Sequence, residues 1–457
     1  MAEDQLLSYA TAAVIGGLVL SQVFRKGFDP FAPVWLFLAG YTQIYVVQAI
    51  MYREWAVRVR GAELVAAANG RALWALLWFL AVYYSNIGKF VAAKLPGAPR
   101  HWSPGLIAGI APPMIIWGLA CSGIMLAQRD DASAEENLLR QFPIFMLIAG
   151  VLLIVTGRQP DNPRPALAWS GVAIAAGYSL IWMFNGKRSH SLIGVLTGVC
   201  AFYAPRGRRP SLPVLAATGL ACALSVGLAI GWRGNRNYER SPAGFVQYVA
   251  EFNVDTMLIS MNVKDGDESA GYVKEKASKE TEEYGGFLLM MDTVPLKAAY
   301  DYGESYMRLI STYIPRFLWP DKPFYGRQQW VNAWIAGSEF PRDATFTGPA
   351  IGILGATQLN GGAVGTLVVL GVLGLLTRTS YEYYRRHATC PWAQAWWAMT
   401  YYNSWLMTAN DDPFVWFYYI YGHTTLPPFA CLWLYHRLAA PQAATAGWAP
   451  AGAVGVC

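Results

Sequence analysis

The chain has 457 residues, of which 54% are hydrophobic and only 14% are charged, and its mean hydropathy is +0.27. Because a soluble domain usually carries about a quarter of charged residues, this composition excludes an ordinary water-soluble protein and indicates an integral membrane protein. The net charge of +6 comes from short basic clusters between apolar stretches, a pattern typical of loop anchors, and it excludes a nucleic-acid partner.

Apolar stretches of membrane-spanning length follow one another along the chain, eight before a long polar interval and three after it. They predict an all-α, polytopic helix bundle with about eleven transmembrane helices. The predicted spans are 8–24, 33–51, 72–93, 104–127, 142–155, 166–184, 191–203, 214–232, 348–376, 391–407 and 413–438.

These spans divide the chain into four segments. Residues 1–232 form an N-terminal transmembrane bundle, and residues 233–346 form one large loop between helices 8 and 9. Residues 347–440 hold the C-terminal helices, and residues 441–457 form a flexible tail. Basic residues are more frequent in the loops that are cytoplasmic if the N-terminus lies outside, although the region 53–71 opposes this bias. We therefore expect the large loop on the extracytoplasmic face.

The region 302–323 of the large loop carries its most informative sequence. Aromatic and apolar residues recur there at helical spacing from Tyr302 and Tyr306 onward, which predicts a helix with one apolar face for packing or for the membrane surface. Pro315, Pro320 and Pro323 then stiffen the backbone.

This stiff segment presents Arg316, Trp319 and Lys322. Two fixed cations suit a diphosphate, and an indole face suits a sugar ring. An anchor for lipid headgroups is an equally good interpretation, because all three residue types are common at membrane interfaces.

The run Tyr302-Gly-Glu-Ser-Tyr306, continued by Ile314-Pro-Arg-Phe-Leu-Trp-Pro-Asp-Lys-Pro323, resembles the signature of bacterial O-antigen polymerases, also called oligosaccharide repeat unit polymerases. The similarity continues through Thr347-Gly-Pro349 and the glycine-rich Gly361-Gly-Ala-Val-Gly365. One departure is Gly355-Ala-Thr-Gln358, where an acidic residue is expected.

This resemblance implies a GT-C-like bundle in the bacterial cytoplasmic (inner) membrane that extends a surface polysaccharide. Donor and acceptor are polyprenyl-diphosphate-linked oligosaccharides, and a chain-length regulator and a flippase are implied protein partners. The acceptor hydroxyl attacks the anomeric carbon of the donor with inversion, and a diphosphate leaves. Fixed cations can neutralise that leaving group, so neither a cofactor nor a metal is expected.

The resemblance assigns the site residues by role. As cations we expect Arg316 first, then Arg308 and Lys322. Glu304 is the first choice for the base and Asp301 the second, although Glu304 and Arg308 are spaced to pair on a helix. Further substrate-binding candidates are Trp319, Tyr302, Tyr306, Arg233, Arg236, Arg327 and Asp411.

Two further polar features of the sequence bear on its function. Asp265-Gly-Asp267 has the DxD pattern of metal-dependent sugar transferases, but its charged surroundings favour a solvated loop. His423 lies in a predicted span, where a polar residue suggests function. Two alternative functions stay open: an O-antigen ligase-type transferase with the same donor, and a flippase or transporter of lipid-linked oligosaccharides.

Overall fold

The computed structural model describes residues 2–23, 28–99, 101–127, 139, 142–207, 209–234, 238–253, 283–303, 306, 314, 318–319, 350–409 and 424–438. Throughout these ranges the regular structure is helical, and no strand occurs. The predicted all-α class is confirmed.

Seven helical stretches of the described chain are long and apolar enough to cross a membrane, so the protein is a helical membrane protein. Each overlaps one of the eleven predicted spans. The seven are α1 (Glu3–Val23), the run of α2 (Pro33–Thr42), η1 (Gln43–Gln48) and α3 (Ala49–Met51), α5 (Ala62–Tyr84), α7 (Pro104–Ala127), α10 (Pro165–Phe184), α12 (Leu212–Gly234) and α19 (Gly352–Arg386).

The other four predicted spans correspond to shorter helices, so the count of eleven is not supported by helix length. α9 (Ile144–Gly157) has 14 residues, and all but Phe145 are buried, which makes it a core helix surrounded by protein. The remaining helices at these positions are α11 (Arg188–Tyr203), α20 (Pro391–Thr400), α21 (Asn403–Ala409) and α23 (Leu426–Leu438).

The predicted span 72–93 was wrong in its boundaries. The helix α5 starts ten residues earlier, at Ala62, after Gly61 turns the chain with a φ of 86°. It ends at Tyr84, and the separate helix α6 (Ile87–Lys94) follows. Arg71, which the sequence placed in a loop, therefore lies inside a membrane-spanning helix.

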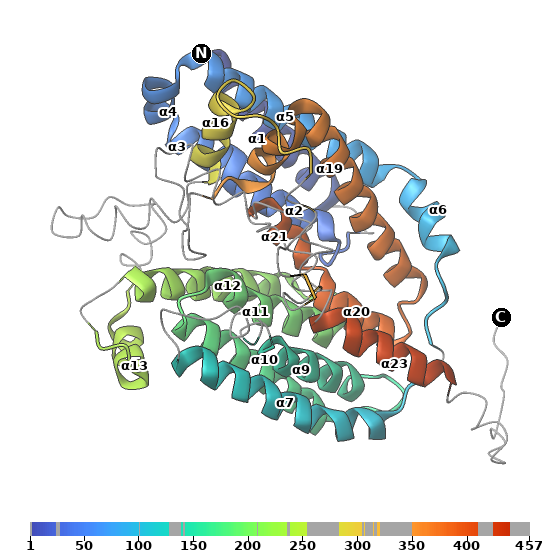
Figure 1. The fold of residues 1–457 in the computed structure, drawn as a ribbon. Coiled ribbons are helices and arrows are strands. Elements are labelled where there is room, and N and C mark those ends of the chain that lie inside the picture. Colours follow the sequence, from blue (N-terminus) through green and yellow to red (C-terminus); the bar gives the residue numbers. More distant parts are fainter. Residues whose placement is uncertain are drawn as a thin grey trace.

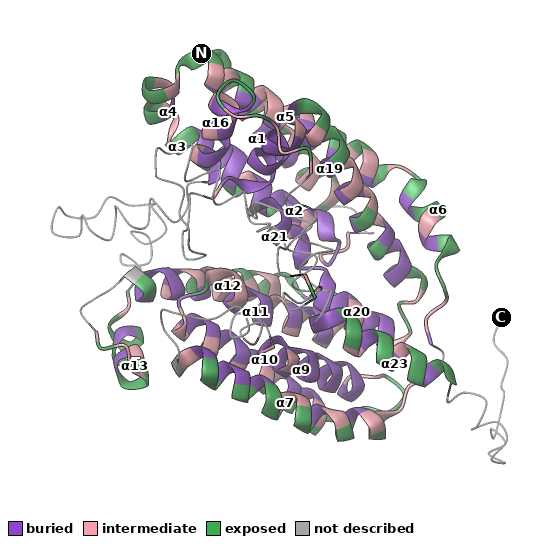
Figure 2. Cartoon of the chain, in the orientation of Figure 1, coloured by how far each residue is buried: buried purple, intermediate pink, exposed green. Residues whose placement is uncertain are grey.

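The helices form two groups (Figure 1). One contains α1, α2, α5, α16 (Glu283–Thr293) and α19, and the other contains α7, α9, α10, α11 and α12. α21 packs on α2, and α20 contacts α9, α11 and α19, so the C-terminal helices join the two groups. The buried residues lie mainly where helices face one another, and exposed residues follow the outer surfaces (Figure 2). The described chain also contains the short helices α4 (Arg53–Arg60), η2 (Ala204–Arg206) and α13 (Pro242–Glu251).

Contacts between chain segments define two ends of the bundle. At the first end, Tyr381 donates to Asp29 at 2.6 Å, and Arg386 donates to the carbonyl of Lys89 at 3.3 Å. At the second end, Arg53 pairs with Asp4 at 2.5 Å. The chain passes from Asp4 at the second end to Asp29 at the first and back to Arg53 at the second, so α1 and the run from α2 to α3 cross the bundle in opposite directions.

Small residues let helices α9 and α10 touch backbone to backbone. A Cβ atom at Gly171 would stand 2.5 Å from the carbonyl oxygen of Gly150 and 2.8 Å from the nitrogen of Ile154. Close approach of this kind is the usual basis of helix packing in membranes, where apolar burial gives little driving force.

We therefore expect Gly171→Ala to destabilise the protein by about 1–3 kcal/mol, because the backbone of α9 cannot move aside without repacking the core. The matched control is Gly177→Ala in the same helix, where a Cβ would meet nothing within 4 Å. Thermal unfolding in detergent measures both. Equal unfolding midpoints for the two variants would contradict the close α9–α10 contact.

Candidate functional site

The helix α16 and the first half of α19 pack against each other and begin at neighbouring positions. α19 bends at Gly361 and Gly362, whose backbone angles are not helical, so residues 352–360 form a separate half. α16 packs on this half through a buried apolar cluster. A Cβ atom at Gly352 would stand 3.4 Å from that of Glu283, so both helices begin at the same place inside the protein.

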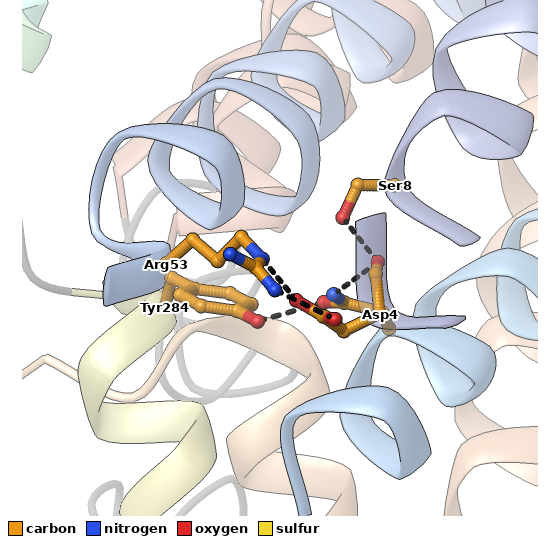
Figure 3. A network of polar contacts seen from close by, with 5 residues as sticks. Asp4, Ser8, Arg53 and Tyr284 are labelled. Carbon is orange, nitrogen blue, oxygen red and sulfur yellow. Dashed lines mark hydrogen bonds and ion pairs between the residues drawn. The ribbon is translucent and has the colours of Figure 1, made fainter. Parts of the chain in front are cut away.

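A buried polar network fixes the start of α16 (Figure 3). The hydroxyl of Tyr284 donates to Asn69 at 2.7 Å, and the Asn69 amide donates to the carbonyl of Asp4 at 3.0 Å. The Asp4 carboxylate accepts two hydrogen bonds from Arg53, at 2.5 and 3.2 Å. Ser8 adds a hydrogen bond to the same Asp4 carbonyl. α16 is therefore tied to α1, α4 and α5.

The first residue of α16, Glu283, is buried, with 2% of its surface exposed. One carboxylate oxygen accepts a hydrogen bond from Arg188 at 2.9 Å, and the other accepts one from the Gln48 amide at 2.9 Å. Gln48 in turn accepts from the backbone N–H of Tyr284 at 3.0 Å. A buried carboxylate is tolerated when it is paired in this way, and the N-terminus of a helix adds to its stability.

Beside this cluster runs an apolar cavity of about 550 Å³, which is within the usual range for ligand sites. We call it the groove. Its walls come from α2, η1, α11 and α12, and Tyr401 and Trp405 also line it. Because α2 and α12 belong to different helix groups, the groove lies between the two groups of Figure 1. Among the described residues that line it, Arg188 is the one with a formal charge.

The arrangement favours an amphiphile with an acidic head. An apolar chain can lie in the groove, while Arg188 and the N-termini of α16 and α19 supply positive potential at its end. Glu283 pairs with one nitrogen of the Arg188 guanidinium, and Arg188 also lines the groove.

Two of the predicted site residues form a turn that is fastened to α19. The backbone N–H of Asp301 donates to the carbonyl of Leu359 at 2.9 Å, and that of Gly303 donates to Asn360 at 3.0 Å. Tyr302 between them is 80% exposed and has a φ of 46°, a left-handed conformation that is unusual for a tyrosine.

Three other predicted residues have defined surroundings. Tyr306 packs against the main core, and its N–H donates to Gly303 at 2.9 Å. Arg233 is exposed in the last turn of α12, next to Gly186, and its carbonyl accepts from Arg240. Trp319 is half-buried.

The remaining predicted site residues lie outside the described residues, so their relation to the groove stays a prediction. They are Arg316, Glu304, Arg308, Lys322, Arg236, Arg327 and Asp411, together with His423 and the pair Asp265 and Asp267.

Sequence reasoning missed Glu283 and Gln48, and it treated Arg188 only as a loop charge. A polar Gln48 inside the apolar span 33–51 was the available signal. Among the described residues, no group of three or more His, Cys, Asp or Glu side chains could hold a metal ion.

Comparison with models of protein families, with curated proteins and with solved structures finds no match for this chain.

The pairing of Arg188 with Glu283 predicts strong energetic coupling. Arg188→Met and Glu283→Gln should each lower the free energy of unfolding. The double variant should lose less stability than the sum of the two single losses, with a coupling energy of about 1–3 kcal/mol. The reason is that the second substitution removes the group that the first one leaves unpaired. Thermal unfolding of the four proteins gives the cycle, and Arg58→Met in α4, where the side chain is exposed, serves as control. If the stability loss of the double variant equals the sum of the two single losses, Arg188 and Glu283 do not stabilise the protein as a pair.

Proposed function

We propose that this protein is a membrane glycosyltransferase that polymerises polyprenyl-diphosphate-linked oligosaccharide repeat units into a surface polysaccharide. The observation that carries the proposal is the apolar groove with one cation, Arg188, at its end. A polyprenyl diphosphate has the same two parts, a long apolar chain and an anionic head.

The position of the motif segment supports this proposal. The turn at Asp301 and Tyr302 begins the region that resembles the O-antigen polymerases, and it is fastened to the first half of α19. That half starts beside Glu283, so the segment and the end of the groove share one end of the bundle. Sugars attached to a lipid in the groove would therefore emerge toward the motif segment.

In the proposed reaction, a hydroxyl of the acceptor repeat unit attacks the anomeric carbon of the donor chain. A carboxylate, Glu304 in first place, removes the hydroxyl proton, and the bond to the diphosphate oxygen breaks. Arg316, Arg308 and Lys322 neutralise the departing diphosphate. The exposed ring of Tyr302 offers a flat surface for a sugar.

The alternation of helix ends supports the proposed topology. Arg158 and Arg378 belong to the first end, and Arg53 and Arg188 belong to the second. We propose that the second end, with residues 233–346, faces outward across a bacterial cytoplasmic membrane, and that shorter helices such as α11 complete about eleven crossings.

This topology predicts which single cysteines react with a membrane-impermeant thiol reagent in intact spheroplasts. Leu296→Cys replaces a side chain that is 84% exposed next to α16, and it should be labelled without lysis. Thr389→Cys, exposed after α19, should be labelled only after lysis. The parent chain gives the background from native cysteines, and the reverse labelling pattern would invert the topology.

The activity is tested with purified protein and a synthetic lipid-linked repeat unit, in excess chelator, by following a ladder of products. Arg316→Ala should reduce the ladder on the order of a hundredfold or more, because a charge-assisted contact to the leaving diphosphate is lost. Arg316→Lys should restore little, because an ammonium lacks the bidentate fork.

The control for this assay is Arg58→Ala at matched protein level. Normal ladders from Arg316→Ala would remove Arg316 from the site. Activity that requires a divalent ion would move the leaving-group role to a metal. Transfer of glycan to a non-identical acceptor, without a ladder, would identify a ligase-type enzyme.

A further inference from the structure

Arg71 stands out among the partly buried arginines at the second end of the bundle. Arg53, Arg60 and Arg188 each pair with a carboxylate, those of Asp4, Asp292 and Glu283. Within the ranges that the structure describes, no carboxylate lies within 4.0 Å of the Arg71 guanidinium.

In the described part of the chain, the contacts of Arg71 are to neutral groups. One nitrogen donates to the side-chain oxygens of Gln358, at 3.1 Å, and Thr366, at 3.4 Å. The guanidinium carbon lies 5.4 Å from the ring centre of Trp74. These contacts orient the guanidinium, but they do not neutralise its charge.

A charge inside a spanning helix is costly. An arginine within a transmembrane helix usually faces a partner or water-filled space. Arg71 is half-buried and belongs to α5, so part of its surface is open to a ligand. An anion would supply the missing compensation.

The bend of α19 lies against Arg71 and adds positive potential. Thr366, which contacts Arg71, also donates to the carbonyl of Gly362 at 3.0 Å, in the first turn after the bend. The second half of α19 therefore presents its N-terminus, with backbone N–H groups that lack helical acceptors, near the guanidinium. Two positive groups side by side repel one another unless an anion lies between them.

The surroundings of the bend have room for such an anion. A Cβ atom at Gly361 would meet nothing within 4 Å, so the chain is open there. At Gly362, by contrast, a Cβ would stand 2.8 Å from the hydroxyl of Tyr300, which places a further hydrogen-bond donor at the bend. An open bend, a cation and a hydroxyl donor together form a phosphate-binding arrangement.

We propose that Arg71, Tyr300 and the bend of α19 bind the phosphate group of a lipid, at a site separate from the groove at Arg188. Gly361 lies nine residues beyond Gly352, which is about 13 Å along a helix. The sources that share this chemistry are an isoprenoid diphosphate and an anionic glycerophospholipid. Assignment of the site to the second lipid-linked substrate rests on the proposed function, whereas its phosphate chemistry does not.

The test measures binding of fluorescent farnesyl diphosphate to the purified full-length protein in nanodiscs of neutral lipid. This probe carries no sugar, so its binding is independent of polymerisation. The parent should bind it in two phases. Arg71→Gln should weaken one phase by tenfold or more, and Arg188→Gln should weaken the other. Tyr300→Phe, which removes only a hydroxyl, should weaken the Arg71 phase by roughly threefold to tenfold. Arg58→Gln should change neither phase.

Competition with phosphatidylglycerol distinguishes the two sources. Displacement from the Arg71 phase by isoprenoid diphosphate but not by phosphatidylglycerol supports a substrate site. Equal displacement supports a lipid-phosphate site and overturns its assignment to a substrate. Unchanged binding to folded Arg71→Gln and Tyr300→Phe proteins overturns the site itself, even if the product ladder of the parent is normal. Conversely, loss of the Arg71 phase in a protein that forms no ladder supports the site and counts only against the proposed function.

Discussion

The carboxylate of Glu283 lies among apolar helices, and its two hydrogen bonds, from Arg188 and Gln48, decide how the rest of this end is built. A buried charge without partners would cost several kcal/mol, so the start of α16 has to remain where both donors reach it. Those donors come from different helix groups, since Gln48 ends η1 and Arg188 begins α11. One carboxylate thereby fixes the spacing of the two groups, and with it the width of the groove between them.

This constraint also explains why α19 starts where it does. Gly352 has a φ of 60°, and a side chain there would crowd the hydroxyl of Tyr45 at 3.0 Å. Tyr45 in turn accepts the backbone N–H of Leu354 at 3.0 Å, which satisfies one donor of the first turn. Two helix starts thus meet inside an apolar bundle, where Glu283 and the N–H of Leu354 each have a polar partner. Such an interior is suited to an anionic ligand, because the positive helix ends are already assembled before the ligand arrives.

The membrane-spanning part of the fold could be predicted from sequence because bilayer thickness sets the length of an apolar helix. Prediction failed where the hydropathy of a helix does not show whether lipid or protein surrounds it. α9 is as apolar as a span, but it is covered by protein, and hydropathy alone does not separate these cases. Arg71 was placed in a loop because a charge usually ends a span, whereas here it is held by Gln358 and Thr366, far away in the sequence.

The candidate site was less accessible to prediction. Gln48 and Glu283 are 235 residues apart, and a single sequence carries no sign that they meet. The turn at Asp301 and Tyr302 was found through its motif, and the structure adds how α19 holds it. The cations Arg316 and Lys322 lie outside the described residues and stay predictions.

The π-helical segment η1 explains how Gln48 comes to point at Glu283. A π-helical turn contains an additional residue, so the chain beyond it is rotated by about 100° relative to an uninterrupted α-helix. The Gln48 amide, at the end of this segment, contacts Glu283 in the interior, while Val47 and Met51 line the groove. A single inserted residue is enough to create such a segment. A lipid-facing helix can in this way acquire a polar contact at one position and keep its apolar surface elsewhere.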